Sequence, residues 1–179
     1  MTGERYLLVF NAGSSSLKFE LFSVGAGIQS RLAGAVSDLD GPQPVLRIGQ
    51  GEGERLEGHF GARDAAALIL ERLDAGVQGI RLTQDKLIGS GHRVVHGGEE
   101  FSAPVRVTVS VFDALKSLST LAPLHNPPAL AVMQAVGERF PSLPMAAVFD
   151  TAFFHDLPHS VRSYAIPAEW TRRYGIRRY

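Results

Sequence analysis

The sequence predicts an α/β domain built on a sheet of mixed strand direction. The first third consists of apolar or alternating segments separated by turn residues, which is typical of antiparallel strands. The rest alternates segments of helical spacing with short apolar segments. Polar clusters also lie where three of the expected strands end, at Asn11, at residues 93–98 with Arg93, and at Asp150. Because ligands of open α/β sheets bind outside the carboxyl ends of strands, these positions indicate one shared cleft.

Hairpin strands are expected at the start of the chain. Residues 5–10 are apolar, and the small polar residues 11–16 that follow favour a tight turn. Residues 17–24 alternate between apolar and polar side chains, so the pair predicts a β-hairpin. Further strands are expected around 29–36, 44–48 and 55–60, separated by glycine-rich segments.

Helices and strands are expected to alternate afterwards, within one domain of residues 1–179. The apolar spacing predicts a helix over 64–73 and a strand over 87–95. Ser110 and Asp113 have capping-box spacing at the start of a short apolar stretch. Asn126, followed by two prolines, has the pattern of an N-cap for an amphipathic helix that continues to Phe140. A strand over 145–149 and a short helix over 166–174 complete the pattern.

Composition excludes several classes of function. The chain has 179 residues, 18 Lys and Arg and 18 Asp and Glu, so its formal net charge is zero. A protein that binds nucleic acid or an anionic membrane normally has a basic excess, so neither partner is expected. The absence of cysteine excludes disulfides and thiolate metal sites. The N-terminal apolar run is too short for a signal peptide or a membrane span, which indicates a cytoplasmic protein.

The predicted turn at Asn11 has residues suited to phosphate binding. Backbone N–H groups and the hydroxyls of Ser14 and Ser16 can surround phosphate oxygens, and Lys18 adds a cation. The segment is not a Walker A loop, because the Gly-Lys-Ser/Thr ending and the following helix are missing. On these residues alone a plain hairpin turn with a solvated Lys18 is the favoured interpretation.

Arg93 lies in an otherwise apolar strand, where a guanidinium needs an anionic partner. Its planar fork suits a carboxylate or a phosphate of a ligand. The alternative is a structural ion pair, with Glu99 or Glu100 as candidate partners. His92 is expected on the opposite face of the strand, and metal binding by His92 and His96 is disfavoured because their spacing would suit only a helix.

Two further residues are candidates for contacts with an anion or a metal. His125 lies in a proline-bounded loop before a helix N-terminus, where its imidazole can face an anion. A role in capping the loop is equally compatible with this position. Asp150 ends a strand beside small residues, where a carboxylate can hold Mg²⁺ or orient a reactant. A turn or N-cap aspartate is the alternative.

Four motifs in this order resemble the acetokinase family. They are the segments 11–19 (NAGSSSLKF), 91–98 (GHRVVHGG), 121–127 (LAPLHNP) and 149–153 (FDTAF). The segments 164–167 and 174–179 also match. The resemblance implies an actin-like (ribonuclease-H-like) fold and a reversible, Mg²⁺-dependent transfer of a phosphoryl group from ATP to acetate.

The resemblance also implies roles for individual residues. Asn11 would face the transferred phosphoryl group and the metal, with Ser14, Ser16 and Lys18 in the same hairpin. Arg93 would bind the carboxylate or the phosphoryl group. His125 would donate a hydrogen bond to that group, Asp150 would act on the metal or orient acetate, and Val95 and Leu124 would line the pocket for the acetate methyl group.

The resemblance covers less than half of the family's length and leaves several questions open. The second, nucleotide-binding domain is absent from this sequence, so the 179 residues alone are expected to be inactive. Propionate or butyrate remains an alternative substrate, and the resemblance implies that the full-length protein is a homodimer. A non-catalytic binding domain is the alternative of another class. A ribonuclease-H-like nuclease is disfavoured because the first strand ends in Asn11 rather than an acidic residue.

Overall fold

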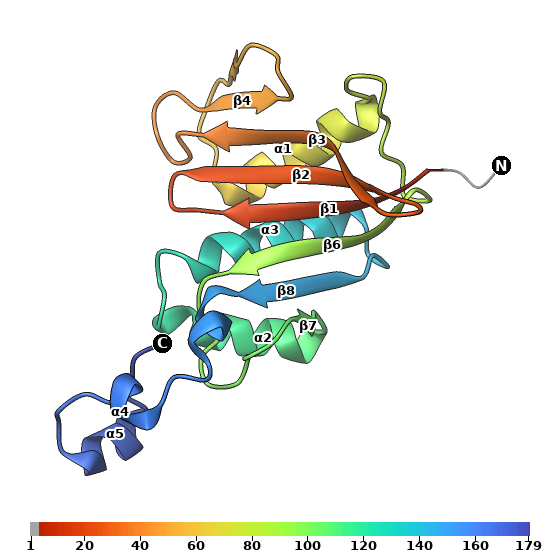
Figure 1. Cartoon of the computed structure of the whole chain (residues 1–179). Helices are drawn as coiled ribbons and strands as arrows, with labels where there is room; N and C mark the ends of the chain where they lie inside the picture. Colours follow the sequence, from red (N-terminus) through yellow and green to blue (C-terminus); the bar gives the residue numbers. More distant parts are fainter. Residues whose placement is uncertain (1–3) are drawn as a thin grey trace.

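The computed structural model describes residues 4–179, and an eight-stranded mixed sheet organises them (Figure 1). The strand order is β5-β4-β3-β2-β1-β6-β8-β7, in which β1, β6 and β8 are parallel to one another. The expected α/β class with antiparallel strands first is confirmed. The strands are β1 (Arg5–Ala12), β2 (Ser16–Val24), β3 (Ile28–Ser37), β4 (Val45–Ile48), β5 (Glu54–Arg55), β6 (Leu87–Val94), β7 (Val105–Arg106) and β8 (Met145–Phe149).

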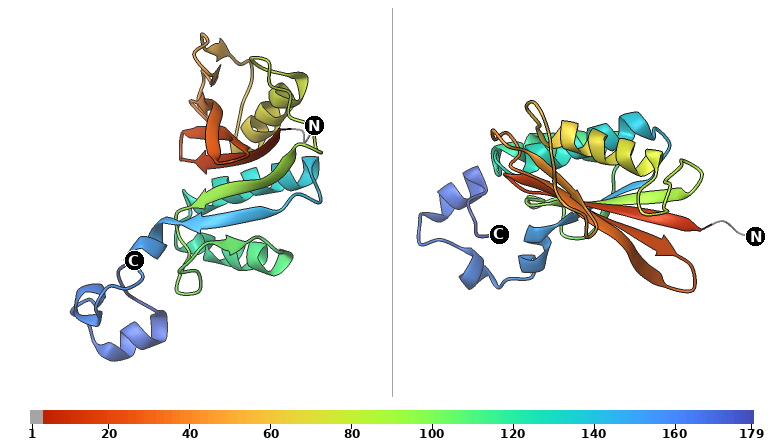
Figure 2. Two further views of the ribbon diagram at one scale, coloured as in Figure 1. Left: turned by 45° about the vertical axis from the view of Figure 1, so that its right-hand side comes forward. Right: turned by 90° about the horizontal axis from the view of Figure 1, so that it is seen from above.

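Two long helices cover one face of the sheet and leave much of the other face open (Figure 2). The core forms between this helical layer and the sheet, with Ile69 and Leu73 from one helix and Met133 and Val136 from the other fully buried. The shorter α2 packs against α3. The helices are α1 (Ala62–Ala75), α2 (Val109–Ser117), α3 (Asn126–Arg139), α4 (His159–Arg162) and α5 (Ala168–Tyr174), with 3₁₀ turns η1 (Leu118–Thr120) and η2 (Asp150–Phe154).

The predicted N-terminal hairpin is present, and its strands are longer than the sequence pattern indicated. Leu8 and Phe10 of β1 and Leu17 of β2 point into the core, as the alternation of β2 requires. The pairing continues to Ala12 opposite Leu17, so Asn11 lies within the strand rather than in the turn. The Gly13 amide donates to the Ser16 carbonyl across 2.8 Å and closes the turn.

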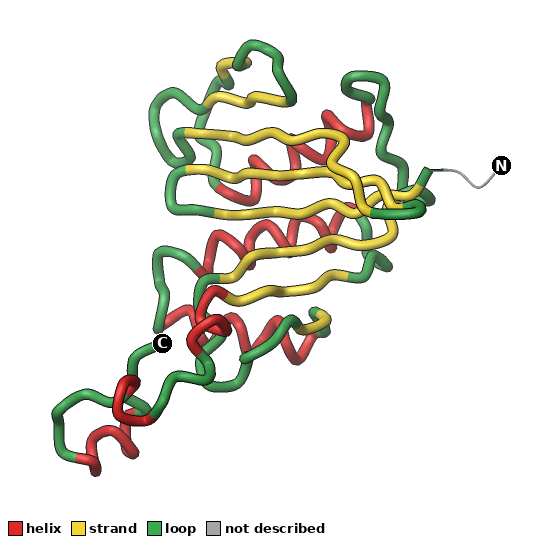
Figure 3. Tube along the Cα trace, viewed as in Figure 1, coloured by secondary structure: helices red, strands yellow, loops and turns green. Residues whose placement is uncertain are grey.

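The parallel strands bring their carboxyl ends to one edge of the sheet, as their arrows show in Figure 1, and β1 and β6 continue into loops at that edge (Figure 3). Helix α3 connects β6 to β8 on the helical face, so its N-terminus lies at this same edge. Asn11 and Arg93 are the next-to-last residues of β1 and β6, Asp150 directly follows β8, and His125 directly precedes α3. The topology therefore places their backbones at one end of the domain.

The strands next to the helical layer are apolar on both faces. Leu7 and Val9 of β1 point away from the helices, as does Ile88 of β6. Together with Val105 and Met145 they line a shallow apolar groove of about 460 Å³ on the open face. Parallel strands with apolar residues on both sides are typical of sheets that are covered on both sides.

Some boundaries differ from those expected. The strand expected over 55–60 is wrong: β5 comprises only Glu54–Arg55, which pairs with Val45 and Leu46 of β4, and residues 56–60 lie outside the strand. The two-residue strand β7 and the one-turn helix α4 were not predicted. Helix α2 begins after Thr108 rather than at Ser110, since the Thr108 hydroxyl accepts a hydrogen bond from the Val111 amide at 3.3 Å.

The C-terminal segment extends beyond the carboxyl edge of the sheet and carries α4 and α5 (Figure 1). It returns to the sheet through its last residues. The Tyr179 ring lies 4.3 Å from that of His96, and the Arg177 guanidinium pairs with Glu99 at 3.1 Å and lies 4.6 Å from the Tyr179 ring. Within residues 4–179, no helix is long and apolar enough to cross a membrane.

Candidate active site

A cluster of three polar side chains lies at the carboxyl ends of the parallel strands. Arg93 donates through Nε to both carboxylate oxygens of Asp150, at 2.9 and 3.1 Å, and its Nη2 is also bonded to Oδ2. The other terminal nitrogen, Nη1, donates to the Asn11 amide oxygen at 3.0 Å. One guanidinium thus links residues that are 82 and 57 positions away in the sequence.

Sheet register explains why these side chains meet. Asn11 is the partner of Arg93 between β1 and β6, and Arg93 is the partner of Val148 between β6 and β8. Residues opposite one another on neighbouring strands point to the same face, and Asp150 follows two residues after Val148. Lys18 is the partner of Asn11 on β2 and is exposed on that face. The four polar residues therefore gather on the open face of the sheet.

The electrostatics of the cluster keep Arg93 positively charged. Its hydrogen bonds to Asp150 and the attraction to that carboxylate raise the Arg93 pKa, against a smaller lowering by partial burial. The alternative of an ion pair between Arg93 and Glu99 or Glu100 is not observed. Arg93 pairs with Asp150, and Glu99 pairs with Arg177. The acid that satisfies Arg93 is Asp150, itself one of the predicted site residues.

Thr151 joins the end of β8 to the end of β6. Its backbone N–H donates to the Val95 carbonyl at 3.3 Å, and its hydroxyl accepts from the Gly97 amide at 3.0 Å. Sequence reasoning did not assign Thr151 a role, because a threonine after a strand has no local signature. The two bonds hold Asp150 and Val95 at a fixed separation.

The loop before α3 reaches the same edge of the sheet, but the side chains of His125 and Leu124 are exposed to solvent. Leu124 is 70% exposed, and the exposed His125 imidazole forms no capping hydrogen bond. The expectation that Asn126 is the N-cap is wrong. His125 occupies that position, and the buried Asn126 side chain bonds to the backbone of His96.

The hairpin residues predicted to bind phosphate are accessible. Ser14 and Lys18 are exposed, and Ser16 is half-buried as the first residue of β2. The Ser15 carbonyl accepts from the Leu39 amide at 3.0 Å, so part of the turn is held from behind by the segment after β3. The serine hydroxyls remain next to the edge where Asn11 and Arg93 lie.

His92 belongs to the core, on the face opposite Arg93 as expected. Its ring stacks on Phe10 with centroids 5.7 Å apart, and a ring nitrogen lies 2.9 Å from the Ser90 hydroxyl. Burial lowers the pKa of His92 from 6.5 to about 4, so the ring is neutral at pH 7. The pKa of His96 is lowered by burial and by the nearby Arg177 charge.

Two oxygen donors in the cluster have the chemistry that Mg²⁺ prefers. They are the amide oxygen of Asn11 and the carboxylate of Asp150, both within hydrogen-bond reach of Arg93. Magnesium sites commonly combine one or two such groups with water and substrate phosphate oxygens. The described residues contain no group of three or more His, Asp and Glu side chains arranged to hold a metal. The donor set therefore fits a metal only together with phosphate or water.

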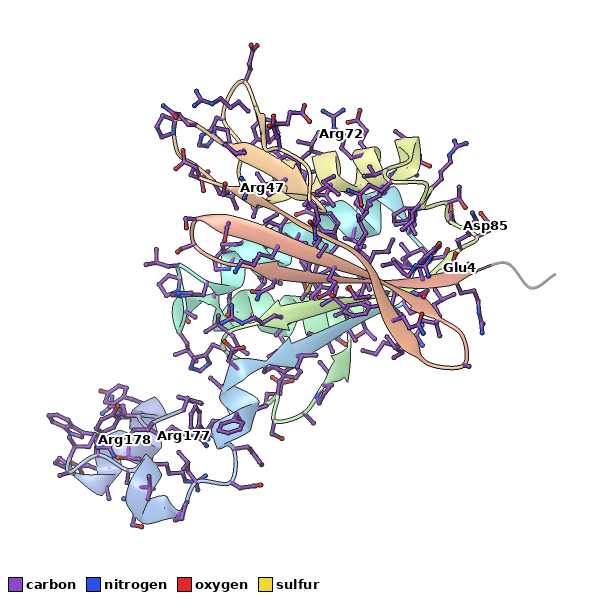
Figure 4. All side chains as sticks on the ribbon, turned by 45° about the horizontal axis from the view of Figure 1, so that its top comes forward. Glu4, Arg47, Arg72, Asp85, Arg177 and Arg178 are labelled. Atoms are coloured by element: carbon purple, nitrogen blue, oxygen red, sulfur yellow. The ribbon has the colours of Figure 1, made fainter. Side chains whose placement is uncertain are left out.

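One solvent-open pocket of the domain lies away from this cluster. A cavity of about 920 Å³ opens at the opposite edge of the sheet, where Glu4 and Asp85 lie close together (Figure 4). Its lining mixes acidic and basic side chains, among them Arg31, which pairs with Glu4. The side chains of the candidate site are partly exposed, at 38% for Arg93 and 42% for Asp150.

Comparison with known proteins agrees with the resemblance found in the sequence. The acetokinase family is matched over residues 6–179, which is nearly the whole chain. The chain belongs to the acetokinase family.

The fold of this acetokinase chain is similar to the folds of solved relatives. The structure of Porphyromonas gingivalis acetate kinase matches 98% of this chain with a TM-score of 0.84 at 35% sequence identity. A propionate kinase from Francisella tularensis matches 97% with a TM-score of 0.83 at 32% identity. The actin-like fold is thereby confirmed.

Among curated acetokinases, the chain is 43% identical to acetate kinase of Deinococcus radiodurans over 178 residues. This match covers 97% of the chain and 43% of that relative. Acetate kinase of Micrococcus luteus is also 43% identical, over 97% of the chain and 41% of the relative. The chain thus spans less than half the length of the relatives it matches.

Proposed function

We propose that these residues form the N-terminal domain of a short-chain acyl kinase. The reaction is the reversible conversion of ATP and acetate to ADP and acetyl phosphate. The observation that carries the proposal is the contact of Arg93 with both Asn11 and Asp150 at the carboxyl edge of the sheet. Family membership and the acetate kinase relatives support the same activity.

Phosphoryl transfer to a carboxylate depends on neutralising negative charge and positioning the reactants more than on covalent catalysis by the protein. A carboxylate oxygen of acetate attacks the γ-phosphorus of ATP, and the bond to the bridging oxygen breaks, so its electron pair leaves with ADP. Arg93 suits this step because its fork can hold two oxygens of an anion at once. Preorganised cations aimed at the transferred phosphoryl group are the usual source of rate enhancement in such reactions.

Asn11 and Asp150 are proposed to hold Mg²⁺ together with phosphate oxygens of the nucleotide. A bound Mg²⁺ neutralises charge on the phosphates and helps to align them. Asp150 also orients Arg93 through paired hydrogen bonds, and thereby fixes the direction in which its remaining N–H groups point. Lys18 is the partner of Asn11 on β2, and Ser14 and Ser16 lie at the turn between β1 and β2. All three are proposed to contact phosphate oxygens.

Val95 and Leu124 are proposed to contact the methyl group of the carboxylate substrate, and His125 to donate a hydrogen bond to the phosphoryl group. The exposure of Leu124 suits this role, because burying it against a substrate methyl group is favourable. The propionate kinase of Francisella tularensis has a closely similar fold, so propionate is a second candidate substrate. Butyrate remains a third.

A chimera tests the proposal directly. Residues 1–179 would be joined to the C-terminal part of Deinococcus radiodurans acetate kinase, which is 43% identical over the matched part. Formation of acetyl phosphate from ATP and acetate, and its loss on substitution of Arg93, would support the proposed activity. A folded chimera that binds ATP but produces no acyl phosphate from acetate, propionate or butyrate would contradict it.

A further inference from the structure

The side chain of Asn126 joins two segments of the domain that are 30 residues apart. Its Oδ1 accepts a hydrogen bond from the His96 amide at 3.1 Å, and its Nδ2 donates to the His96 carbonyl at 2.9 Å. The side chain is fully buried, with no exposed surface. One carboxamide therefore satisfies both backbone polar groups of a single residue.

This arrangement differs from the capping role that the local sequence favours. An N-cap side chain bonds to amides of its own helix, two or three residues further along. Asn126 is the first residue of α3 and directs its side chain to the segment after β6 instead. The first turn of α3 is thus fastened to the end of the central parallel strand.

The tied residues have the proposed substrate contacts as direct neighbours. Val95 directly precedes His96, and Arg93 lies two residues before Val95. His125 directly precedes Asn126, and Leu124 lies one residue before His125. Adjacent Cα atoms are about 3.8 Å apart, so a tie between positions 96 and 126 restrains residues on both segments. The loop with His125 has no other side-chain anchor to β6 among the hydrogen bonds of the described residues.

We propose that Asn126 is a positioning residue for phosphoryl transfer. It fixes the loop that carries Leu124 and His125 against the end of β6, which carries Arg93 and Val95. The inference rests on the proposed function, because those four residues are its proposed substrate contacts. Asn126 itself is fully buried and acts only through the loop that it holds.

The carboxamide is required because the tie needs a donor and an acceptor on one side chain. Aspartate of the same size accepts from the His96 amide but cannot donate to the carbonyl when ionised. Leucine keeps the branching and the number of side-chain heavy atoms and leaves both backbone groups without a partner. A buried backbone group that loses its partner is costly, so the loop is expected to move until water reaches it. Asn126→Asp and Asn126→Leu therefore weaken the tie by different amounts.

The test uses the 179-residue chain, with acetyl phosphate as the probe in an NMR titration. Wild type is expected to bind acetyl phosphate with a response at Arg93 and His125. Asn126→Asp is expected to weaken binding up to about tenfold, and Asn126→Leu more. One lost hydrogen bond of this strength can lower the population of the correctly placed loop by about that factor, and apparent affinity falls with that population. Gln134→Leu is the matched control, because Gln134 lies on α3 and bonds only to the exposed Glu138.

Hydrogen exchange of the His96 amide tests the Asn126–His96 hydrogen bonds independently of acetyl phosphate binding. Exchange of the His96 amide should accelerate strongly in Asn126→Leu and remain slow in Gln134→Leu. Asn126 variants that keep folded spectra and bind acetyl phosphate as tightly as wild type overturn the positioning role. Unchanged exchange of the His96 amide in Asn126→Leu overturns the tie itself. A wild-type chain that exchanges as expected but binds no acetyl phosphate counts against the proposed function instead.

Discussion

Arg93 and Asp150 form a fork-to-carboxylate pair across the ends of β6 and β8, with Nε donating to both oxygens at 2.9 and 3.1 Å. Their side chains are 38% and 42% exposed. An ion pair this exposed typically contributes no more than about 1 kcal/mol to stability. The pair is therefore poorly explained as a device for holding the fold together, and its position at the carboxyl edge matters more.

Replacing Arg93 should impair catalysis far more than folding. In the chimera described above, Arg93→Ala is expected to reduce turnover by roughly a hundredfold or more, since one placed transition-state contact is worth on the order of 3 kcal/mol. Arg93→Lys should recover only part of the loss, because an ammonium cannot make the bidentate contact. Turnover and melting temperature are to be measured on the same samples. An unstable but fully active Arg93→Ala variant would show that the role is structural.

Removing the charge of Asp150 should also affect activity selectively. Asp150→Asn keeps the shape of the side chain but loses the charge that orients Arg93, so turnover of the chimera should fall at least tenfold, an order-of-magnitude expectation for one contact. Asp74→Asn is the matched control, because Asp74 pairs with Arg139 at 2.6 Å with side chains that are 35% and 46% exposed. Equal activity losses in the two variants would contradict the site assignment.

Gly97 should not tolerate a side chain. A Cβ there would lie 2.5 Å from the Phe101 carbonyl oxygen and 2.9 Å from the Phe149 ring. Relieving such contacts requires movement of backbone, so Gly97→Ala is expected to destabilise the chain by about 1–3 kcal/mol in urea unfolding. Gly25→Ala provides the comparison, since no atom lies within 4 Å of its added Cβ. Similar unfolding midpoints for both variants would refute the prediction.

The buried His92 should make stability fall on acidification. Its pKa is about 4 in the folded chain and 6.5 as a model group, so the folded state binds its proton less readily than the unfolded state. Above pH 6.5 the residue has no effect. Between pH 6.5 and 4 its contribution to stability is progressively lost, up to about 3 kcal/mol. Urea midpoints across this range should fall less steeply for His92→Leu than for wild type.

A purified polypeptide of these 179 residues should show no measurable turnover of ATP and acetate. The relatives that it matches are more than twice as long, and the nucleotide-binding domain implied by the resemblance lies outside the matched part. A coupled assay for ADP, run beside the active chimera, decides the point. Sustained acetyl phosphate formation by the polypeptide alone would show that the site is complete within it.

Much of the architecture and the centre of the site could be predicted from local patterns. The strand ends at Asn11, Arg93 and Asp150 follow from apolar segments that stop at polar residues, and parallel strands bring such ends to one edge. The partner of Arg93 could not be predicted, because it depends on the register of β6 with β8. Glu99 was closer in sequence but is engaged by Arg177.

Asn126 shows why local signals were insufficient elsewhere. An asparagine before two prolines has the same sequence pattern whether it caps its own helix or bonds to a distant segment. The outcome depends on His96, 30 residues away, whose amide and carbonyl have no other hydrogen-bond partner among residues 4–179. The strand expected over 55–60 was wrong for a similar reason. A strand forms only where a neighbouring strand is available for pairing, and the local sequence pattern does not show whether one is.

The apolar groove on the open face of β1, β6 and β8 has a consequence for handling the chain in solution. Val9 and Val148 expose 39% and 48% of their surface beside it, and contiguous apolar surface in water favours contact between molecules. Self-association through this face would increase with protein concentration and with salts such as sulfate, which strengthen apolar burial. We therefore expect the 179-residue chain to associate least in dilute, low-salt samples.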